Sequence, residues 1–177
     1  MVYKKEVLAF RQEKDKFFKS SHHSPLTENQ KRNFVGLQYF PVDEKYRLKV
    51  KLQRDPNPER VTMQTSDGLW RDYDRIGYFD IKIDGQKARV YVYQSSDNPD
   101  YYFIPFKDAT SGKETYGAGR YVEIEPLGND EFILDFNMAY NPYCAYNGRF
   151  SCPIPPRENW LDIRIEAGEK NYPEPEY

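Results

Sequence analysis

The first part of the chain carries apolar residues at the spacing of an amphipathic helix. The face that they share consists of Tyr3, Val7, Phe10, Lys14 and Phe17. A stretch rich in serine and histidine, ending at Pro25, terminates this helix. Thr27 and Gln30 then have the spacing of a capping box, which opens a second, short helix, and Gly36 is a suitable stop for it. The pattern therefore predicts one or two N-terminal helices.

Beyond Pro41 the apolar period changes from that of a helix to that of a strand. Tyr46, Leu48 and Val50 alternate with charged residues, as in a strand with one buried face. Asp84-Gly85 is the strongest hairpin signal in the chain, and the proline-containing stretch 55–58 is predicted to be a turn. The predicted strands cover residues 46–52, 61–65, 78–83, 87–93, 101–106, 121–125, 131–136 and 161–165.

No segment of helical length separates these strands, so parallel β–α–β units are not expected. The predicted fold class is mainly β (α+β): an antiparallel β-barrel or barrel-like sandwich of about eight or nine strands, with one or two N-terminal helices. The 177 residues have the length of one domain. Within 1–177 we expect an N-terminal helical segment (1–40), a β domain (41–168) and a loose, Pro- and Glu-rich tail (169–177).

The charge balance narrows the class of function. The chain has 26 Lys and Arg against 28 Asp and Glu, a net charge of −2, so the basic excess that nucleic-acid binding relies on is missing. No run approaches the roughly 18 apolar residues of a membrane span. The first residues lack the apolar stretch of a secretory signal, which indicates a cytoplasmic location for the chain as given. A trimmed form of an exported protein would have the same pattern.

Cysteine and histidine are scarce. Cys144 and Cys152 do not form a C-x-x-C motif, and the histidines are His22 and His23. A zinc site would need all four residues, and adjacent histidines rarely point at the same metal. We therefore expect no metal and no cofactor. A disulfide in an exported form and two reduced thiols in the cytoplasm both remain open.

One candidate site lies between the strands predicted at 101–106 and 121–125. The intervening loop contains three glycines together with Asp108, Tyr116 and Arg120. Glycines let a backbone approach a ligand closely, and an arginine can hold an anion through two hydrogen bonds. The alternative is a long hairpin loop whose Asp, Ser and Thr side chains satisfy their own turn. Spacing alone favours this structural alternative, and the glycine pattern does not match a phosphate-binding P-loop.

A second candidate site follows the strand predicted at 131–136. Here aromatic residues and prolines surround a group of polar side chains, which they would hold in a rigid, partly dry loop. These side chains are Asp135, Asn137, Asn141, Cys144 and Glu158. Asp135 or Glu158 could serve as a general base, and Cys144 as a nucleophile if a neighbour lowered its pKa. The alternative is a structural loop with buried thiols or a short-range disulfide.

These segments also resemble a known family. The motifs are F-K-D-A-T-S-G-K-E-T-Y-G-A-G-R-Y (106–121), L-D-F-N-M-A-Y-N-P-Y-C-A-Y (134–146), C-P-I-P-P-R-E-N-W-L (152–161) and A-G-E-K (167–170), with S-P-L (24–26) and G-L-x-Y-F (36–40) nearer the N-terminus. They resemble the prokaryotic family known as domain of unknown function 1684, some of whose members look exported or lipid-anchored. The resemblance implies that the two candidate segments face one shared pocket. It implies no reaction and no role for any single residue.

The leading functional hypothesis is a small-molecule site in or at the mouth of the barrel. The expected ligand-binding residues are Asp108, Tyr116, Arg120, Asn137, Tyr140 and Asn141, and the catalytic candidates are Asp135, Glu158 and Cys144. Arg120 would bind an anionic group of an unidentified small molecule, while the tyrosines stack or donate hydrogen bonds. If the protein is an enzyme, hydrolysis or another acid–base reaction fits these residues best.

Two other classes of function stay open. The first is an interaction module, in which exposed aromatic residues bind a protein or glycan partner; the chain has 16 Tyr, 11 Phe and 2 Trp. A contiguous exposed aromatic patch would favour this module. The tyrosines that discriminate are Tyr91, Tyr93, Tyr101 and Tyr102. The second is a thiol or metal protein built on Cys144 and Cys152. The ligand, the reaction and the oligomeric state are left open.

Overall fold

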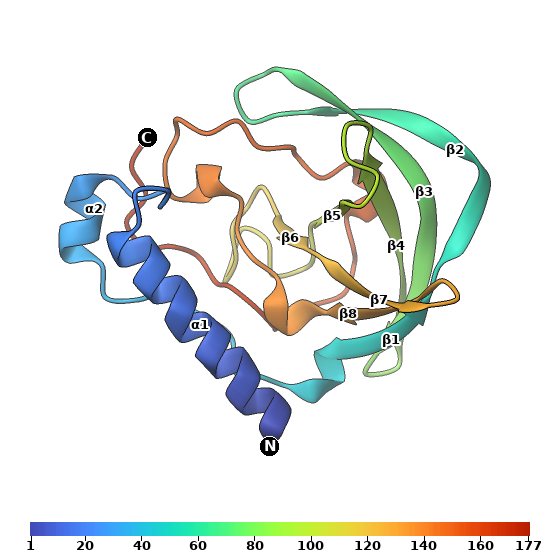
Figure 1. The fold of residues 1–177 in the computed structure, drawn as a ribbon, viewed down its shortest axis with the longest axis horizontal. Coiled ribbons are helices and arrows are strands. Elements are labelled where there is room, and N and C mark those ends of the chain that lie inside the picture. Colours follow the sequence, from blue (N-terminus) through green and yellow to red (C-terminus); the bar gives the residue numbers. More distant parts are fainter.

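The computed structural model describes the whole chain, residues 1–177, and begins with the two predicted helices (Figure 1). Helix α1 spans Val2–Ser20 and α2 spans Glu28–Asn33. The capping box is present, because the Thr27 hydroxyl accepts from the backbone N–H of Gln30 and the Gln30 side chain accepts from the backbone N–H of Thr27. None of the helices is long and apolar enough to cross a lipid bilayer.

The buried face of α1 is displaced from the predicted one. Val7 is buried as expected, but the other buried residues are Arg11 and Phe18. Phe10 is 49% exposed and Phe17 is 38% exposed. The helical period was therefore predicted correctly, whereas the assignment of Phe10 and Phe17 to the buried face was wrong. Both phenylalanines border a depression on the surface that is described below.

The larger sheet is antiparallel, with the strand order β2-β3-β4-β5-β6. The strands are β2 (Gln53–Gln64), β3 (Trp70–Ile83), β4 (Gln86–Ser95), β5 (Tyr102–Phe106) and β6 (Arg120–Val122). The predicted hairpin joins β3 and β4. Asp84 and Gly85 make its turn with φ of 50° and 79°, the left-handed conformation that this turn requires.

The stretch 55–58, predicted to be a turn, lies inside β2. This strand forms the edge of the sheet, where prolines such as Pro56 and Pro58 leave no ladder hydrogen bond unmade. Its pairing with β3 is irregular between Arg54 and Glu59. The prediction was wrong because an edge strand accepts residues that would end a central one.

The smaller sheet has the order β1-β8-β7, again antiparallel. Its strands are β1 (Arg47–Lys51), β7 (Ile124–Gly128) and β8 (Glu131–Asp135). The chain changes sheet at two single residues, Leu52 between β1 and β2 and Glu123 between β6 and β7. The two sheets are thus not closed into one barrel but pack as a sandwich, the second of the two predicted forms.

The core lies between the two sheets (Figure 1). Phe79 of β3 contacts Phe132 of β8 at 5.8 Å between ring centroids, and Phe106 contacts Phe136 at 5.3 Å. All four rings are buried. Residues of this kind explain the high aromatic content of the sequence, because large rings fill the space between two curved sheets.

Two C-terminal segments differ from prediction. Residues 161–165 alternate buried and exposed side chains as a strand would, but they join no sheet. Their backbone bonds instead to the loop after β5, as in the N–H of Ala109 donating to Ile163 O (2.9 Å). The tail beyond residue 168, predicted to be loose, lies against α2: the Glu176 carboxylate accepts hydrogen bonds from Thr27 (2.8 Å) and Asn29 (2.9 Å).

Candidate functional site

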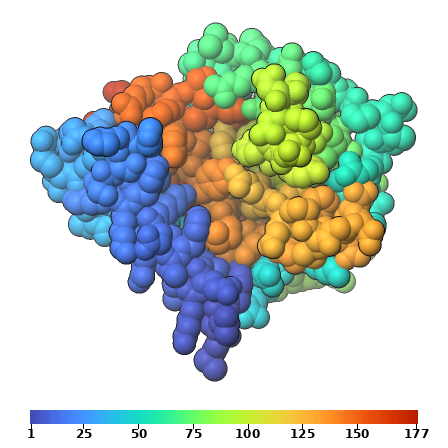
Figure 2. All heavy atoms as spheres, in the orientation of Figure 1, coloured from blue at the N-terminus to red at the C-terminus, as the bar shows by residue number.

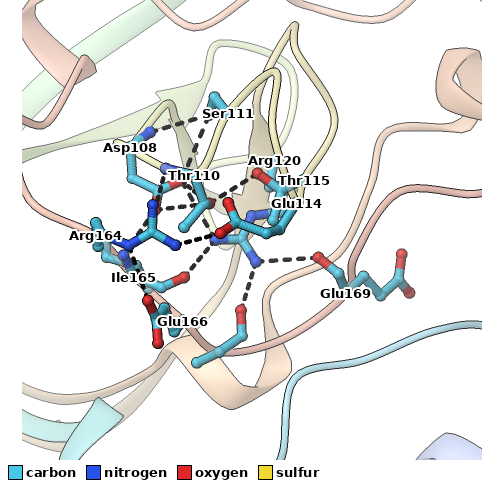
Figure 3. A network of polar contacts seen from close by, with 11 residues as sticks. Asp108, Thr110, Ser111, Glu114, Thr115, Arg120, Arg164, Ile165, Glu166 and Glu169 are labelled. Carbon is cyan, nitrogen blue, oxygen red and sulfur yellow. Dashed lines mark hydrogen bonds and ion pairs between the residues drawn. The ribbon is translucent and has the colours of Figure 1, made fainter.

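The loop between β5 and β6 encloses a buried arginine (Figure 3). The Arg120 guanidinium donates to the backbone carbonyl oxygens of Ile165 (3.0 Å), Ala167 (2.5 Å) and Glu169 (3.1 Å). It also lies 3.5 Å from the Asp108 carboxylate. Burial lowers the pKa of Arg120, and the neighbouring Asp108 acts in the opposite direction. The three carbonyls and one carboxylate occupy the positions that an external anion would need.

Asp108 is held by its own loop and by the segment that contains Ile165. Its carboxylate accepts from the backbone N–H of Ile165 (2.7 Å) and from the Thr110 hydroxyl (2.9 Å). The Thr110 hydroxyl lies 2.9 Å from that of Thr115. All these groups are buried. The hydroxyls of this loop therefore make their hydrogen bonds within the loop itself, as the structural alternative predicted. Arg120 and Asp108 are not part of the site proposed below.

Asp135 ends β8 and fastens helix α1 to it. One carboxylate oxygen accepts from the hydroxyl of Tyr3 (2.5 Å), and the other accepts from the backbone and side-chain N–H groups of Asn137 (both 3.0 Å). Burial and Asp135 together raise the pKa of Tyr3. Asn137 is buried and also bridges the backbone of Asp43, at 2.8 and 3.0 Å. Asn137 thus positions Asp135 and the following turn.

A second polar contact fixes α1 further along. The buried Glu169 carboxylate accepts from the Tyr146 hydroxyl (2.6 Å) and the backbone N–H of Asn141 (2.9 Å), and it pairs with Lys14 of α1. The Asn141 side chain donates to Lys170 O (2.9 Å). Burial and Glu169 raise the pKa of Tyr146. Asn141 is therefore anchored by the C-terminal segment.

Between α1 and the sheets the surface is hollowed (Figure 2). The hollow lies between α1 (dark blue), the loop before β5 (yellow-green) and the β7–β8 hairpin (orange). Three adjoining depressions of about 450, 520 and 350 Å³ share one lining residue, Tyr140. We call them together the Tyr140 groove. Of the predicted ligand-binding residues, Tyr140 and Asn141 line it, and so does Asp135.

Tyr140 is held firmly at the centre of the groove. Its backbone exchanges two hydrogen bonds of 2.9 Å with Tyr121, and the two rings meet edge to face at 5.9 Å. Its hydroxyl donates to Glu123 (3.2 Å), and Lys14 Nζ lies 5.1 Å from the ring centroid. Burial, followed by the neighbouring Tyr101 and Glu123, raises the pKa of Tyr140. The phenol therefore stays protonated at neutral pH.

The two ends of the groove differ in chemistry. The depression of about 450 Å³, here called the acidic cleft, is lined by four carboxylates and one arginine. These residues are Glu6, Glu123, Glu125, Asp135 and Arg47. The depression of about 350 Å³, here called the tyrosine cleft, is lined mainly by aromatic rings and prolines. Its aromatic residues are Tyr73, Tyr101, Phe103, Tyr121, Tyr140, Tyr143 and Phe150.

Two thiols lie at the tyrosine cleft. Cys152 lines it, and the buried Cys144 is in contact with Cys152 through its backbone N–H, which donates to Cys152 Sγ (3.3 Å). The Tyr116 hydroxyl is 3.7 Å from Cys144 Sγ. Hydrogen bonding, first from Cys152 and then from Tyr116 and Ser66, lowers the pKa of Cys144 to about 6 against the effect of burial. The same thiol–thiol contact and burial raise the pKa of Cys152.

Glu158 lies apart from these groups. It is in the short helix η4 (Arg157–Asn159), where it pairs with Arg75 (2.5 Å) and accepts from the Tyr93 hydroxyl. It lines none of the three depressions. The structure thus brings Asp135, Tyr140 and Asn141 to one groove and Tyr116 to Cys144. It does not bring Arg120, Asp108 or Glu158 to that groove.

The prediction from sequence missed the groove residues that come from α1 and from the point where the chain passes from one sheet to the other. Tyr3 and Phe10 line the acidic cleft from the helix, and Glu123 lines it from the residue between β6 and β7. The repeated aromatic residues on one face of α1 were the available signal, although they were not considered as part of a site. Nothing in the local pattern marks Glu123, because its position depends on where the chain changes sheet.

The fold and the groove together define the class of this protein. It is an antiparallel β sandwich of two sheets with an aromatic groove under an N-terminal helix. Residues 32–170 match the family described as "Protein of unknown function (DUF1684)", so the chain belongs to that family, as its motifs indicated. It is similar to the solution NMR structure of an uncharacterized protein from Haloarcula marismortui, with a TM-score of 0.72 and 38% identity over 95% of this chain and 94% of that one. No curated protein matches the chain.

Proposed function

We propose that this protein binds a small organic molecule in the Tyr140 groove, with an aromatic or apolar body over the tyrosines and a positively charged group in the acidic cleft. The observation that carries the proposal is the joining of three depressions around one rigidly held tyrosine. Ligand sites in proteins are concave, mostly apolar and supplied with a few fixed polar groups.

The charge of the ligand follows from the lining. An anionic ligand was predicted from Arg120, but that guanidinium is enclosed by backbone carbonyls. The acidic cleft instead has four carboxylates against the single Arg47, whose guanidinium lies 5.0 Å over the Tyr3 ring. A cation with an apolar body is attracted both by carboxylates and by the faces of aromatic rings. The groove therefore fits an organic ammonium or guanidinium compound.

Binding is a better fit to the geometry than hydrolysis. Asp135, the carboxylate predicted as a base, accepts three hydrogen bonds from Tyr3 and Asn137. Glu158, the other predicted base, is paired with Arg75 and Tyr93 outside the groove. Both carboxylates act as anchors between segments. We therefore propose a binding role for the groove without assigning it a reaction.

The exposed aromatic patch that would favour an interaction module has little support. Tyr93 is fully buried, and Tyr91, Tyr101 and Tyr102 are only partly accessible. Tyr101 stacks on Phe103 at 6.1 Å within the wall of the tyrosine cleft. These rings build the groove and the core, so the small-molecule hypothesis is the one that we retain.

The test is a titration of the full-length protein with three probes of equal shape and different charge, followed by amide chemical shifts. The probes are phenethylammonium, phenethyl alcohol and hydrocinnamate. We expect phenethylammonium to bind about tenfold more tightly than the other two, with shifts at Tyr140 and β7. A variant carrying Glu123→Gln and Glu125→Gln should lose this preference. Glu131→Gln on the same hairpin is the matched control and should retain it.

Equal affinity for the three probes would contradict the charge assignment. Shifts confined to residues outside the groove, or no saturable shift at millimolar probe, would contradict the binding site itself. The first outcome thus tests the charge of the ligand, and the second tests where the ligand binds.

A further inference from the structure

Cys144 and Cys152 form a compact pair, of which only Cys152 lines the groove described above. The backbone N–H of Cys144 donates to Cys152 Sγ (3.3 Å), which brings the two cysteines into contact. The backbone N–H of Cys152 donates in turn to the Ser66 hydroxyl (3.1 Å). No disulfide joins them. Two thiols in hydrogen-bond contact need little movement to become bonded.

The surroundings of the pair favour an ionised sulfur on one side only. Tyr116, on the loop between β5 and β6, brings its hydroxyl to 3.7 Å from Cys144 Sγ. The neighbouring Cys152, Tyr116 and Ser66 side chains lower the pKa of Cys144 to about 6. Uncharged neighbours are the leading causes of that shift. Neutral hydrogen-bond donors therefore stabilise the thiolate, as they do in reactive thiol sites.

A path to solvent exists through the tyrosine cleft. Cys152 is 8% exposed and lines this cleft of about 350 Å³, and Cys144 is 6% exposed. The remaining walls are aromatic rings, prolines, Asn141, Ser151 and Arg71. A molecule of the size of hydrogen peroxide fits a cleft of this volume.

We propose that Cys144 and Cys152 form a peroxide-reactive dithiol centre, in which the Cys144 thiolate is the attacking group and Cys152 the resolving group. The oxidant is a small hydroperoxide that enters through the tyrosine cleft. This centre shares the tyrosine cleft with the ligand proposed above, because Cys152 lines that cleft, but its chemistry and its test need no ligand.

The chemistry proceeds in two displacements. Cys144 Sγ attacks one oxygen of hydrogen peroxide; the S–O bond forms, the O–O bond breaks, and the leaving hydroxide takes a proton from solvent to become water. Cys152 Sγ then attacks the sulfur of the resulting sulfenic acid; the S–S bond forms, the S–O bond breaks, and the hydroxide leaves as water with the Cys152 proton. The two sulfurs lose two electrons in total, and the peroxide gains them.

The first experiment needs no variant. Native protein is treated with stoichiometric hydrogen peroxide, blocked with a maleimide and measured by intact mass. We expect a loss of about 2 Da, no maleimide addition, and full recovery of both thiols after a dithiol reductant. Two maleimide-reactive thiols after peroxide, or a mass gain from stable oxygen addition, would overturn the proposal.

The second experiment assigns the two roles. In Cys152→Ser the sulfenic acid should persist at Cys144 and be trapped by a cyclic dione, while Cys144→Ser should give at most about one-tenth of that adduct at pH 6, because Cys152 stays protonated. Retained near-ultraviolet circular dichroism establishes that each variant is folded. Equal trapping in both variants would overturn the assignment. In the native protein, a reaction rate with its midpoint near pH 8.5, that of an ordinary thiol, would also overturn it.

Discussion

The loop between β5 and β6 and the segment after β8 are both rich in polar side chains but have different structural roles. The first combines glycines with carboxylates and hydroxyls, the second combines prolines with amides and tyrosines, and both were expected to face one pocket. The first segment closes around Arg120, which is fully buried with carbonyl oxygens from a distant strand-like segment. The second leaves Tyr140 at the centre of three surface depressions.

The difference shows that a cluster of polar residues in the sequence does not by itself identify a binding site. What decides is whether other parts of the chain supply partners for those residues. Residues 161–169 supply carbonyls and N–H groups to Arg120 and Asp108, so that the loop becomes part of the interior. Over Tyr140, helix α1 supplies only the charge of Lys14 and leaves space beside it. The predictions below test this contrast, beginning with the largest effect.

Arg120→Met should be the most destabilising of these changes. It leaves Asp108 as a buried charge without its cation and removes donors from three carbonyls, so we expect a loss of about 3–5 kcal/mol in the free energy of unfolding. Urea denaturation measures this loss. Arg47→Met, at the rim of the groove and exposed, is the matched control and should change stability by no more than about 0.5 kcal/mol. A similar loss of stability in both variants would contradict the difference between the buried loop and the groove.

Gly168→Ala should affect both regions at once. Gly168 follows Ala167, an acceptor for Arg120, and has a φ of 77°. A Cβ there would lie 2.6 Å from the carbonyl oxygen of Ala139, next to Tyr140. We expect a loss of about 3 kcal/mol from strain and overpacking together, and weaker binding of phenethylammonium.

Gly85→Ala separates the two causes of that loss. Gly85 has a φ of 79°, but nothing lies within 4 Å of its added Cβ. Its cost should therefore be only the conformational one, about 1 kcal/mol. If Gly168→Ala costs no more than Gly85→Ala, the close packing between the Arg120 network and the floor of the groove is not significant.

Glu169→Gln should have a smaller effect on stability, localised at the junction of the two regions. The buried carboxylate accepts from Tyr146 and the backbone of Asn141, and the amide can keep only part of these contacts. Replacing charge-assisted hydrogen bonds by neutral ones should cost about 2 kcal/mol in urea unfolding. The exposed Glu166→Gln is the control and should leave stability unchanged. An equal change in the free energy of unfolding in the two variants would mean that Glu169 contributes little to stability despite its burial.

The sequence predicted local elements well and long-range partners poorly. The capping box at Thr27 and the Asp84-Gly85 turn rest on a few neighbouring residues, and both are present. The choice between a barrel and a sandwich depends on Leu52 and Glu123. The alternation of the strand pattern continues through both residues, although the strands before and after each of them belong to different sheets. The burial of Arg120 likewise depends on carbonyl oxygens about 45 residues away, which no local spacing can reveal.

The smallest effect is expected at the contact that joins the two regions, Tyr116 to Cys144. The folded-state pKa of Cys144 is about 6, below its ordinary value of about 9, so the unfolded chain binds more protons between these values. Stability should therefore rise as the pH increases from 6 to 9, and this contribution is lost as the pH falls through 6. Above about pH 9 the raised pKa of Cys152 acts in the opposite direction.

Tyr116→Phe removes one donor to the Cys144 sulfur and leaves the ring in place. We expect the pKa of Cys144 to rise by roughly half a unit, since the effects of the neighbouring Cys152 and Ser66 remain. Ultraviolet absorbance of the thiolate measures this shift, and the rise in stability between pH 6 and 9 should become smaller by a corresponding amount. Tyr143→Phe, next to Cys144 in the chain but without a hydrogen bond to sulfur, is the control. An unchanged titration in Tyr116→Phe would mean that the two regions meet there by packing alone, and that the thiolate depends on Cys152 and Ser66.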